Sequence, residues 1–247
     1  GGLLRELAAA NPGLCLITTR VQVADLDDFI GKTVDRIELK RLPTAAGREL
    51  LRKLGVKGSD AEVDAAVEAY EGHPLSLALL GSLLVAAHGG EAARFREVGL
   101  LAKEDRNGKQ AFRVMDSYDC WLGRRGKPAP RADGGCDRDL ELTAERAVLR
   151  LVGLFDRPAP AGAVIALRAA PAIPGLTEPL AGLTDPEWQK VLSRLRRAQL
   201  LEPEDPKEPG TLAAHPLVRE HFGDKLARER PETFREGHSR LYDYYRQ

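Results

Sequence analysis

The stretch from Tyr70 to Leu84 constrains the fold more than any other part of this chain. It runs Tyr-Glu-Gly-His-Pro-Leu-Ser-Leu-Ala-Leu-Leu-Gly-Ser-Leu-Leu. Pro74 suits the first turn of a helix, because its φ is fixed near the helical value and no partner there needs its missing N–H. The residues after Pro74 are apolar on nearly every side, which predicts a helix buried all round. Gly72 carries no Cβ, so another segment can approach its backbone closely.

This stretch alone leaves two interpretations open. The start of the helix presents backbone N–H groups and the positive end of the helix dipole, and both suit an anion. The simpler interpretation is a packed corner between two helices, which the stretch by itself favours. The segments before and after it decide between the two.

Composition sets bounds on the class of protein. The 247 residues are enough for two or three small domains. Lys plus Arg and Asp plus Glu both number 37, so the zero net charge argues against a basic nucleic-acid footprint. No apolar run is long enough to span a membrane, and the first ten residues lack a basic signal-peptide region. Cys15, Cys120 and Cys136 are odd in number and scattered, which predicts neither a disulfide framework nor a zinc site. We therefore expect a cytoplasmic protein.

The first 42 residues read as the remnant of a parallel α/β sheet. The apolar run Leu14–Ile17 follows a turn and leads into Thr18-Thr19-Arg20, a pattern typical of a buried parallel strand. Arg20 would then lie at the carboxyl end of that strand, where open α/β sheets bind ligands. A second short strand is predicted at 36–39. Because residues 1–42 supply too few neighbouring strands, we expect the rest of the sheet upstream of Gly1 or on another molecule.

Residues 43–122 predict a small helical bundle. Leu50, Leu51 and Leu54 line one face of a first helix, and Ser59 to Glu62 form a capping box for a second. The buried helix from Pro74 follows, and further helices are expected at 91–105 and 111–122. Residues 123–141 are rich in Gly, Pro, Arg and Asp without periodicity, which indicates a flexible linker or insertion.

Residues 142–228 show the element order of a winged helix. One helix follows Thr143 as N-cap, a second is expected at 161–168, and Asp185-Pro186 cap and start a third. Strands at 200–201 and 211–212 then bracket a turn, and three helices followed by a β-ribbon is the winged-helix order. His215-Pro216 opens the next helix, and residues 229–247 start a C-terminal helical region. The expected fold class is thus mainly α: a sheet remnant, a helical bundle and a winged-helix domain with a small β-ribbon.

Four landmarks in this order resemble the NB-ARC family. They are Ile17-Thr18-Thr19-Arg20, then Ile37-x-Leu39-x-x-Leu42, then Gly72-His73-Pro74-Leu75-Ser76-Leu77, and a winged helix ending at His215. NB-ARC proteins are STAND-class switch ATPases of apoptotic activators, plant resistance proteins and bacterial sensors. The resemblance spans about residues 3–226 and implies the C-terminal part of a nucleotide-binding module with its helical and winged-helix subdomains, here of bacterial type.

The resemblance implies roles for four residues. Arg20 resembles the sensor arginine that reads the terminal phosphate, for which the planar guanidinium fork is suited. Gly72 and Pro74 resemble the Gly-x-Pro motif, whose proline packs on the adenine side of the nucleotide. His215 resembles the histidine of the Met-His-Asp motif, which hydrogen-bonds the β-phosphate of ADP in the closed state. The implied cofactor is ADP or ATP. For Arg20 a surface ion pair, and for His215 a structural role, are the alternatives.

The chain also departs from the family pattern. Ala214 and Pro216 replace the Met and Asp of the histidine motif. There is no phosphate-binding loop, because the first glycine of a Gly-x-x-x-x-Gly-Lys-Thr motif would fall at Leu26, so Gly31-Lys32-Thr33 is expected to be a loop. Asp27-Asp28 follow no apolar strand, so a magnesium site is not predicted either. We expect no ATP hydrolysis from this chain alone, and no catalytic or metal residues.

The leading hypothesis is therefore a regulatory part of a STAND switch, which clamps nucleotide and controls opening and oligomerisation. Its expected partners are an upstream nucleotide-binding segment or another chain that completes the sheet, and C-terminal sensor repeats; no membrane is involved. One alternative is a DNA-binding winged-helix regulator, since the helix 185–198 carries four basic residues. Asp185 and Glu187 stand at the end that usually enters the groove, so DNA is disfavoured. The other alternative is a protein-interaction module in which Pro74 and His215 only pack.

Overall fold

The computed structural model describes residues 2–19, 21–38, 41–98, 109–124 and 140–246. These residues are mainly helical, as predicted, and they form no sheet. The chain divides into two compact units, Gly1–Lys40 and Arg41–Gln247, which are described separately.

The first unit contains the helix α1 (Gly2–Ala10) and a short 3-10 helix, η1 (Ala24–Phe29). The predicted strands are absent: residues 14–19 and 36–38 have no regular secondary structure. Leu14 and Leu16 are 96% and 83% exposed instead of buried. The physical reason is the missing neighbours, since a parallel strand is held by hydrogen bonds to adjacent strands. Gly31–Thr33 is a turn, which confirms the predicted loop; Arg20 lies outside the described residues.

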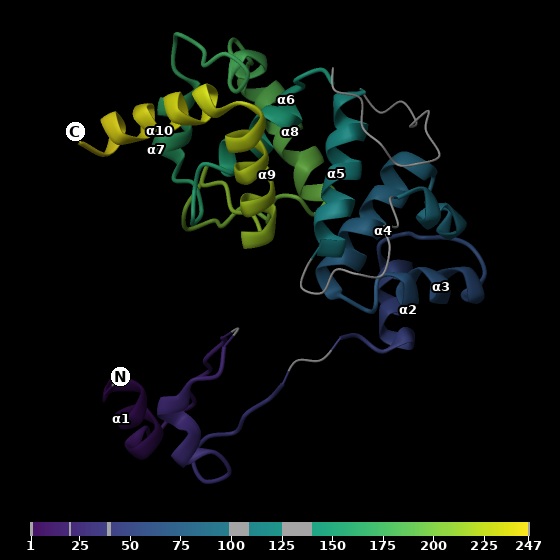
Figure 1. Ribbon diagram of the computed structural model, residues 1–247, viewed down its shortest axis with the longest axis vertical. Helices are drawn as coiled ribbons and strands as arrows, with labels where there is room; N and C mark the ends of the chain where they lie inside the picture. Colours follow the sequence, from purple (N-terminus) through teal and green to yellow (C-terminus); the bar gives the residue numbers. More distant parts are fainter. Residues whose placement is uncertain (1, 20, 39–40, 99–108, 125–139, 247) are drawn as a thin grey trace. The chain divides into compact units, whose positions relative to one another are not determined.

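The second unit begins with a helical bundle (Figure 1). Its elements are α2 (Thr44–Lys53), α3 (Asp60–Ala69), α4 (Pro74–His88), the 3-10 helix η2 (Ala92–Glu97) and α5 (Lys109–Gly123). The capping box at Ser59 and Glu62 is present as predicted. Of the helix expected at 91–105 the structure shows only η2; residues 99–108 lie outside the described part. Likewise, most of the predicted linker 123–141 lies outside it.

Helix α4 is the buried centre of this bundle, as the sequence predicted. Leu77, Leu79, Leu80 and Leu84 have no exposed surface, and even Ser76 is fully buried. The helix packs against α2 and α5. It begins at Pro74 and ends at His88, and Gly89, with a φ of 62°, is its left-handed C-cap.

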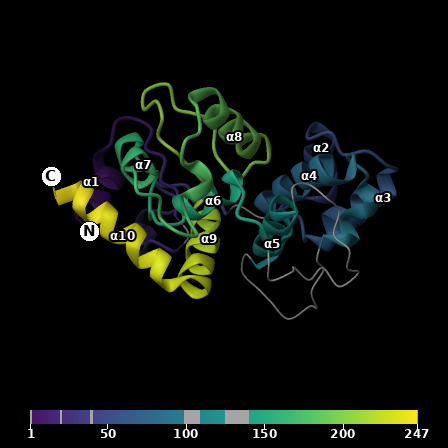
Figure 2. The ribbon, with the colours of Figure 1, turned by 90° about the horizontal axis from the view of Figure 1, so that it is seen from above.

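The remainder of the second unit is also helical. It comprises α6 (Ala144–Val152), α7 (Ala161–Arg168), the short η3 (Glu178–Leu180), α8 (Asp185–Arg197), α9 (Pro216–Glu229) and α10 (Pro231–Arg246). Thr143 caps α6 as predicted. The N-cap of α8 is Thr184 rather than Asp185, because Thr184 and Glu187 form a reciprocal capping box. Figure 2 shows α5 between the bundle and helices α6 and α9, and α5 contacts α4, α6 and α9.

The predicted β-ribbon is reduced to isolated pairings. Ala159 and Leu212 form an antiparallel bridge with two hydrogen bonds of 2.9 Å, and Glu202 N donates to Ala213 O at 2.8 Å. The ladder does not extend because Pro203, Pro206 and Pro209 have no N–H to donate.

Two further observations concern the cysteines and the membrane. Cys15 is free and exposed, whereas Cys120 is disulfide-bonded, which the scattered cysteines did not predict. Within the described ranges, no helix combines the length and the apolar character needed to cross a bilayer.

Candidate functional site

The Gly72–Pro74 corner has the close backbone approach that the sequence predicted. Leu42 N donates to Gly72 O at 2.8 Å, and Gly72 has a φ of 65°. A Cβ placed on Gly72 would lie 2.2 Å from the carbonyl oxygen of Leu42. Pro74 follows as the first residue of α4, and its side chain is exposed. Glycine is therefore required at this corner for a steric reason, and the proline faces solvent.

His73 caps the N-terminus of α4. Its Nδ1 accepts a hydrogen bond from Ser76 N at 3.3 Å, and Ser76 Oγ lies 3.2 Å from the same nitrogen. Burial first, and the nearby Arg41 second, lower the pKa of His73. The ring is therefore neutral above its lowered pKa, with its proton on Nε2. Arg41 forms an ion pair with Glu71 on the same corner.

His215 has the same role at the N-terminus of α9. It is exposed, and its Nδ1 accepts a hydrogen bond from Leu217 N at 3.2 Å. An accepting Nδ1 places the proton of the neutral ring on Nε2, and an N–H donor is what a phosphate oxygen requires. The neighbouring Arg219 holds this segment in place, because its guanidinium donates to Ala214 O and, at 2.9 Å, to Asp156 O.

The four residues singled out from the sequence are not described as one assembled site. Gly72 and Pro74 share a corner of the bundle, whereas His215 begins a helix in the following part of the chain. Arg20 lies outside the described residues. The structure thus describes two candidate corners, each with a histidine as N-cap.

Sequence reasoning missed a group of charges between α5, α6 and α9, which is buried around Asp119 and reaches the surface at Asp116. Arg146 donates two hydrogen bonds to the Asp119 carboxylate, at 2.6 and 3.0 Å, and these side chains are only 4% and 3% exposed. Lys225 Nζ lies 2.9 Å from an oxygen of Asp119 and 2.9 Å from one of Asp116. His221 Nε2 lies 3.4 Å from Asp116, and its ring stacks on Phe112. We call Asp116, Asp119, Arg146, His221 and Lys225 the charge cluster.

The charge cluster keeps its carboxylates ionised. Burial alone would raise the pKa of Asp116, but the His221 ring, whose Nε2 lies 3.4 Å away, and the charge of Lys225 outweigh it and lower the pKa to about 2. Burial would also raise the pKa of Asp119. Arg146 and Lys225 outweigh burial, so the pKa of Asp119 is lowered. A sequence signal did exist: Asp116 and Asp119 of α5 are three residues apart, and His221 and Lys225 of α9 are four apart, so each pair shares a helix face. The sequence alone did not indicate which helices pack against one another.

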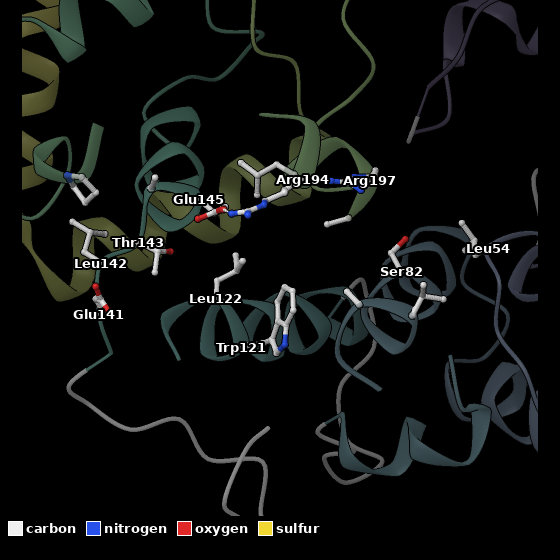
Figure 3. Close-up of a pocket in the computed structure, with 16 residues that line it drawn as sticks. Leu54, Ser82, Trp121, Leu122, Glu141, Leu142, Thr143, Glu145, Arg194 and Arg197 are labelled. Carbon is white, nitrogen blue, oxygen red and sulfur yellow. Dashed lines mark hydrogen bonds and ion pairs between the residues drawn. The ribbon is translucent and has the colours of Figure 1, made fainter. Parts of the chain in front are cut away.

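A pocket of about 850 Å³ lies between α4, α5, α6 and α8 (Figure 3). Its walls are largely apolar, with Trp121 and Leu122 from α5 facing the end of α8. Arg194 and Arg197 of α8 supply cations, and Arg194 Nη1 donates to Glu145 Oε1 at 2.8 Å. Gly72, Pro74 and His215 do not line this pocket.

Comparisons with known proteins give no match to a family model, to a curated protein or to a solved structure. Among the described residues, no group of three or more His, Cys, Asp or Glu side chains could hold a metal ion.

Proposed function

We propose that this chain is the helical and winged-helix part of a STAND-type nucleotide switch, as the resemblance to the NB-ARC family implies. The observation that carries the proposal is the Gly72–Pro74 corner. The backbone of Gly72 closes onto Leu42, and the exposed Pro74 begins a helix that is buried in the bundle. A rigid support with an exposed proline at its tip suits packing against a nucleotide base.

The part after residue 142 supports the winged-helix assignment. Along the chain, α6 is followed by Ala159 and then by α7 and α8. After α8, Glu202 pairs with Ala213, and Leu212 pairs back with Ala159. Three short extended segments paired in this way around three helices match a winged helix whose ribbon is short.

In the proposed switch, the closed state holds ADP between the two corners. Pro74 packs on the adenine side, His215 donates from Nε2 to the β-phosphate, and Arg20 reads the terminal phosphate of ATP. An upstream nucleotide-binding segment supplies the phosphate loop and the magnesium site, which this chain lacks. Loss of the phosphate contacts releases the winged-helix part and frees the protein to oligomerise.

The charges of α8 do not favour the DNA-binding alternative. Arg194 pairs with Glu145 at 2.8 Å and Arg196 with Glu204 at 3.1 Å, so two of the four cations are already engaged by acids. A DNA-binding helix keeps its cations available for phosphates. Binding of a DNA duplex that weakens steeply with salt would nevertheless restore that alternative.

Amide hydrogen exchange tests the proposal in the protein that carries the upstream segment. On addition of ADP, we expect slower exchange at residues 75–77 and 217–219, which start α4 and α9. The start of α3 at residues 61–63 serves as an internal control and should not change. ADP binding without protection at either corner, or no ADP binding at all, would contradict the proposal.

A further inference from the structure

We propose that the pocket between α4, α5, α6 and α8 binds a small amphiphilic monoanion, with an apolar body and a single carboxylate. This inference does not depend on the nucleotide switch, because Gly72, Pro74 and His215 do not line the pocket. It follows from the size of the pocket, its walls and its charges.

Size and walls indicate an apolar body. A volume of about 850 Å³ falls in the range of roughly 300–1,000 Å³ that small-molecule sites occupy. Leu54 and Val85 line it from the bundle, Trp121 from α5, and Leu142 and Leu195 from the elements that follow. Burial of apolar ligand surface against such walls is the main source of affinity.

The charges indicate one negative group at a defined end. The positive charge of Arg194 is balanced by Glu145 at 2.8 Å. Arg197 has no carboxylate partner among the described residues, and its Nε donates only to Ser193 O at 3.4 Å. One uncompensated guanidinium matches one carboxylate, which it can bind through two parallel hydrogen bonds. Glu141 lies at the opposite end of the pocket from Arg197 (Figure 3), so the anion is directed towards Arg197.

A ligand in this position touches both the bundle and the helices after residue 142. Ser82 is in α4 and Trp121 is in α5. Thr143 is the N-cap of α6, and Arg197 is in α8. The ligand therefore favours the arrangement of helices that forms the pocket over any arrangement that opens it.

Trp121 provides a direct readout. The chain has two tryptophans, and Trp188→Phe leaves Trp121 alone while keeping a ring beneath Arg168, whose guanidinium lies 4.0 Å from the Trp188 ring centroid. The probes are decanoate and 1-decanol, which share the apolar body and differ in charge. We expect a saturable change of Trp121 emission with both, and decanoate binding about 2- to 5-fold tighter, as suits an exposed ion pair.

Two variants in that background assign the contacts. Arg197→Gln should weaken decanoate binding about 2- to 5-fold and leave 1-decanol binding unchanged. Lys190→Gln, an exposed cation of the same helix outside the pocket, is the matched control and should change neither. Ala86→Phe, which adds bulk at the pocket wall, should abolish binding of both probes. The proposal is overturned if no saturable signal exists, if Arg197→Gln leaves decanoate binding unchanged, or if correctly folded Ala86→Phe still binds both.

Discussion

At the residue scale, two glycines with similar backbone angles should respond differently to alanine. Gly72 and Gly89 have φ values of 65° and 62°, so alanine costs each roughly 1–2 kcal/mol for the left-handed conformation. A Cβ on Gly89 meets nothing within 4 Å, but on Gly72 it meets the Leu42 carbonyl oxygen at 2.2 Å. Gly72→Ala should therefore destabilise the chain by about 1–3 kcal/mol more than Gly89→Ala. Urea unfolding measures this difference; equal losses would mean that the corner can open without cost.

His73 should make stability depend on pH. Its pKa in the folded chain is lowered, so below about pH 6.5 the unfolded chain binds protons more readily than the folded chain does. The free energy of unfolding should fall as the pH drops through this value towards the lowered pKa. His73→Asn keeps an acceptor for Ser76 N and removes the titration. Unfolding curves between about pH 7.5 and pH 5.5 should show a smaller loss for His73→Asn than for the wild type. An identical loss would show that His73 is not the source of the pH dependence. His88 and His238, whose pKa values are also lowered, would then account for it.

At the scale of elements, the charge cluster should determine how α5 is joined to α6 and α9. Asp119→Ala leaves Arg146 and Lys225 buried without their shared carboxylate, a loss of about 3–5 kcal/mol for a broken buried ion pair. The matched control is Glu49→Ala, which removes an exposed pair with Lys53 at 2.8 Å and should not measurably change stability. Thermal unfolding compares the two, and Asp119→Asn offers a milder change if Asp119→Ala does not fold. A result for Asp119→Asn that equals the Glu49→Ala control would show that the cluster does not hold the helices together.

Local signals predicted most of the helices, and tertiary contacts account for what they missed. Three helix starts depend only on neighbouring residues: those at Pro74, at the Ser59 capping box and at Thr143. These starts could therefore be predicted from the sequence. The predicted strand at residues 14–17 does not form from its own apolar pattern, because strand pairing requires neighbouring strands, and the described residues supply none. The charge cluster and the pocket depend on which helices meet, and nothing local to α5 specifies that α9 lies against it.

At the scale of the whole molecule, α5 connects the two parts of the second unit that carry the proposed nucleotide contacts. The bundle carries the Gly72–Pro74 corner, the helices after residue 142 carry His215, and α5 contacts α4 on one side and α6 and α9 on the other. The charge cluster and the pocket both involve α5 and the later helices. A change in how α5 meets those helices would therefore alter the relation between the two proposed nucleotide contacts.

The central claim is that His215 holds ADP in the closed state, and the most direct measurement is the ADP dissociation rate of the protein that includes the upstream segment. A hydrogen bond to a charged group contributes about 1.5–3 kcal/mol, so His215→Ala should speed ADP release roughly 10- to 150-fold. His215→Ser retains a capping oxygen for the start of α9 but cannot reach the phosphate, so it should behave like His215→Ala. His238→Ala, in α10, should release ADP at the wild-type rate. If His215→Ala and His215→Ser both stay within about twofold of the wild type, His215 is only a helix cap and the account is contradicted.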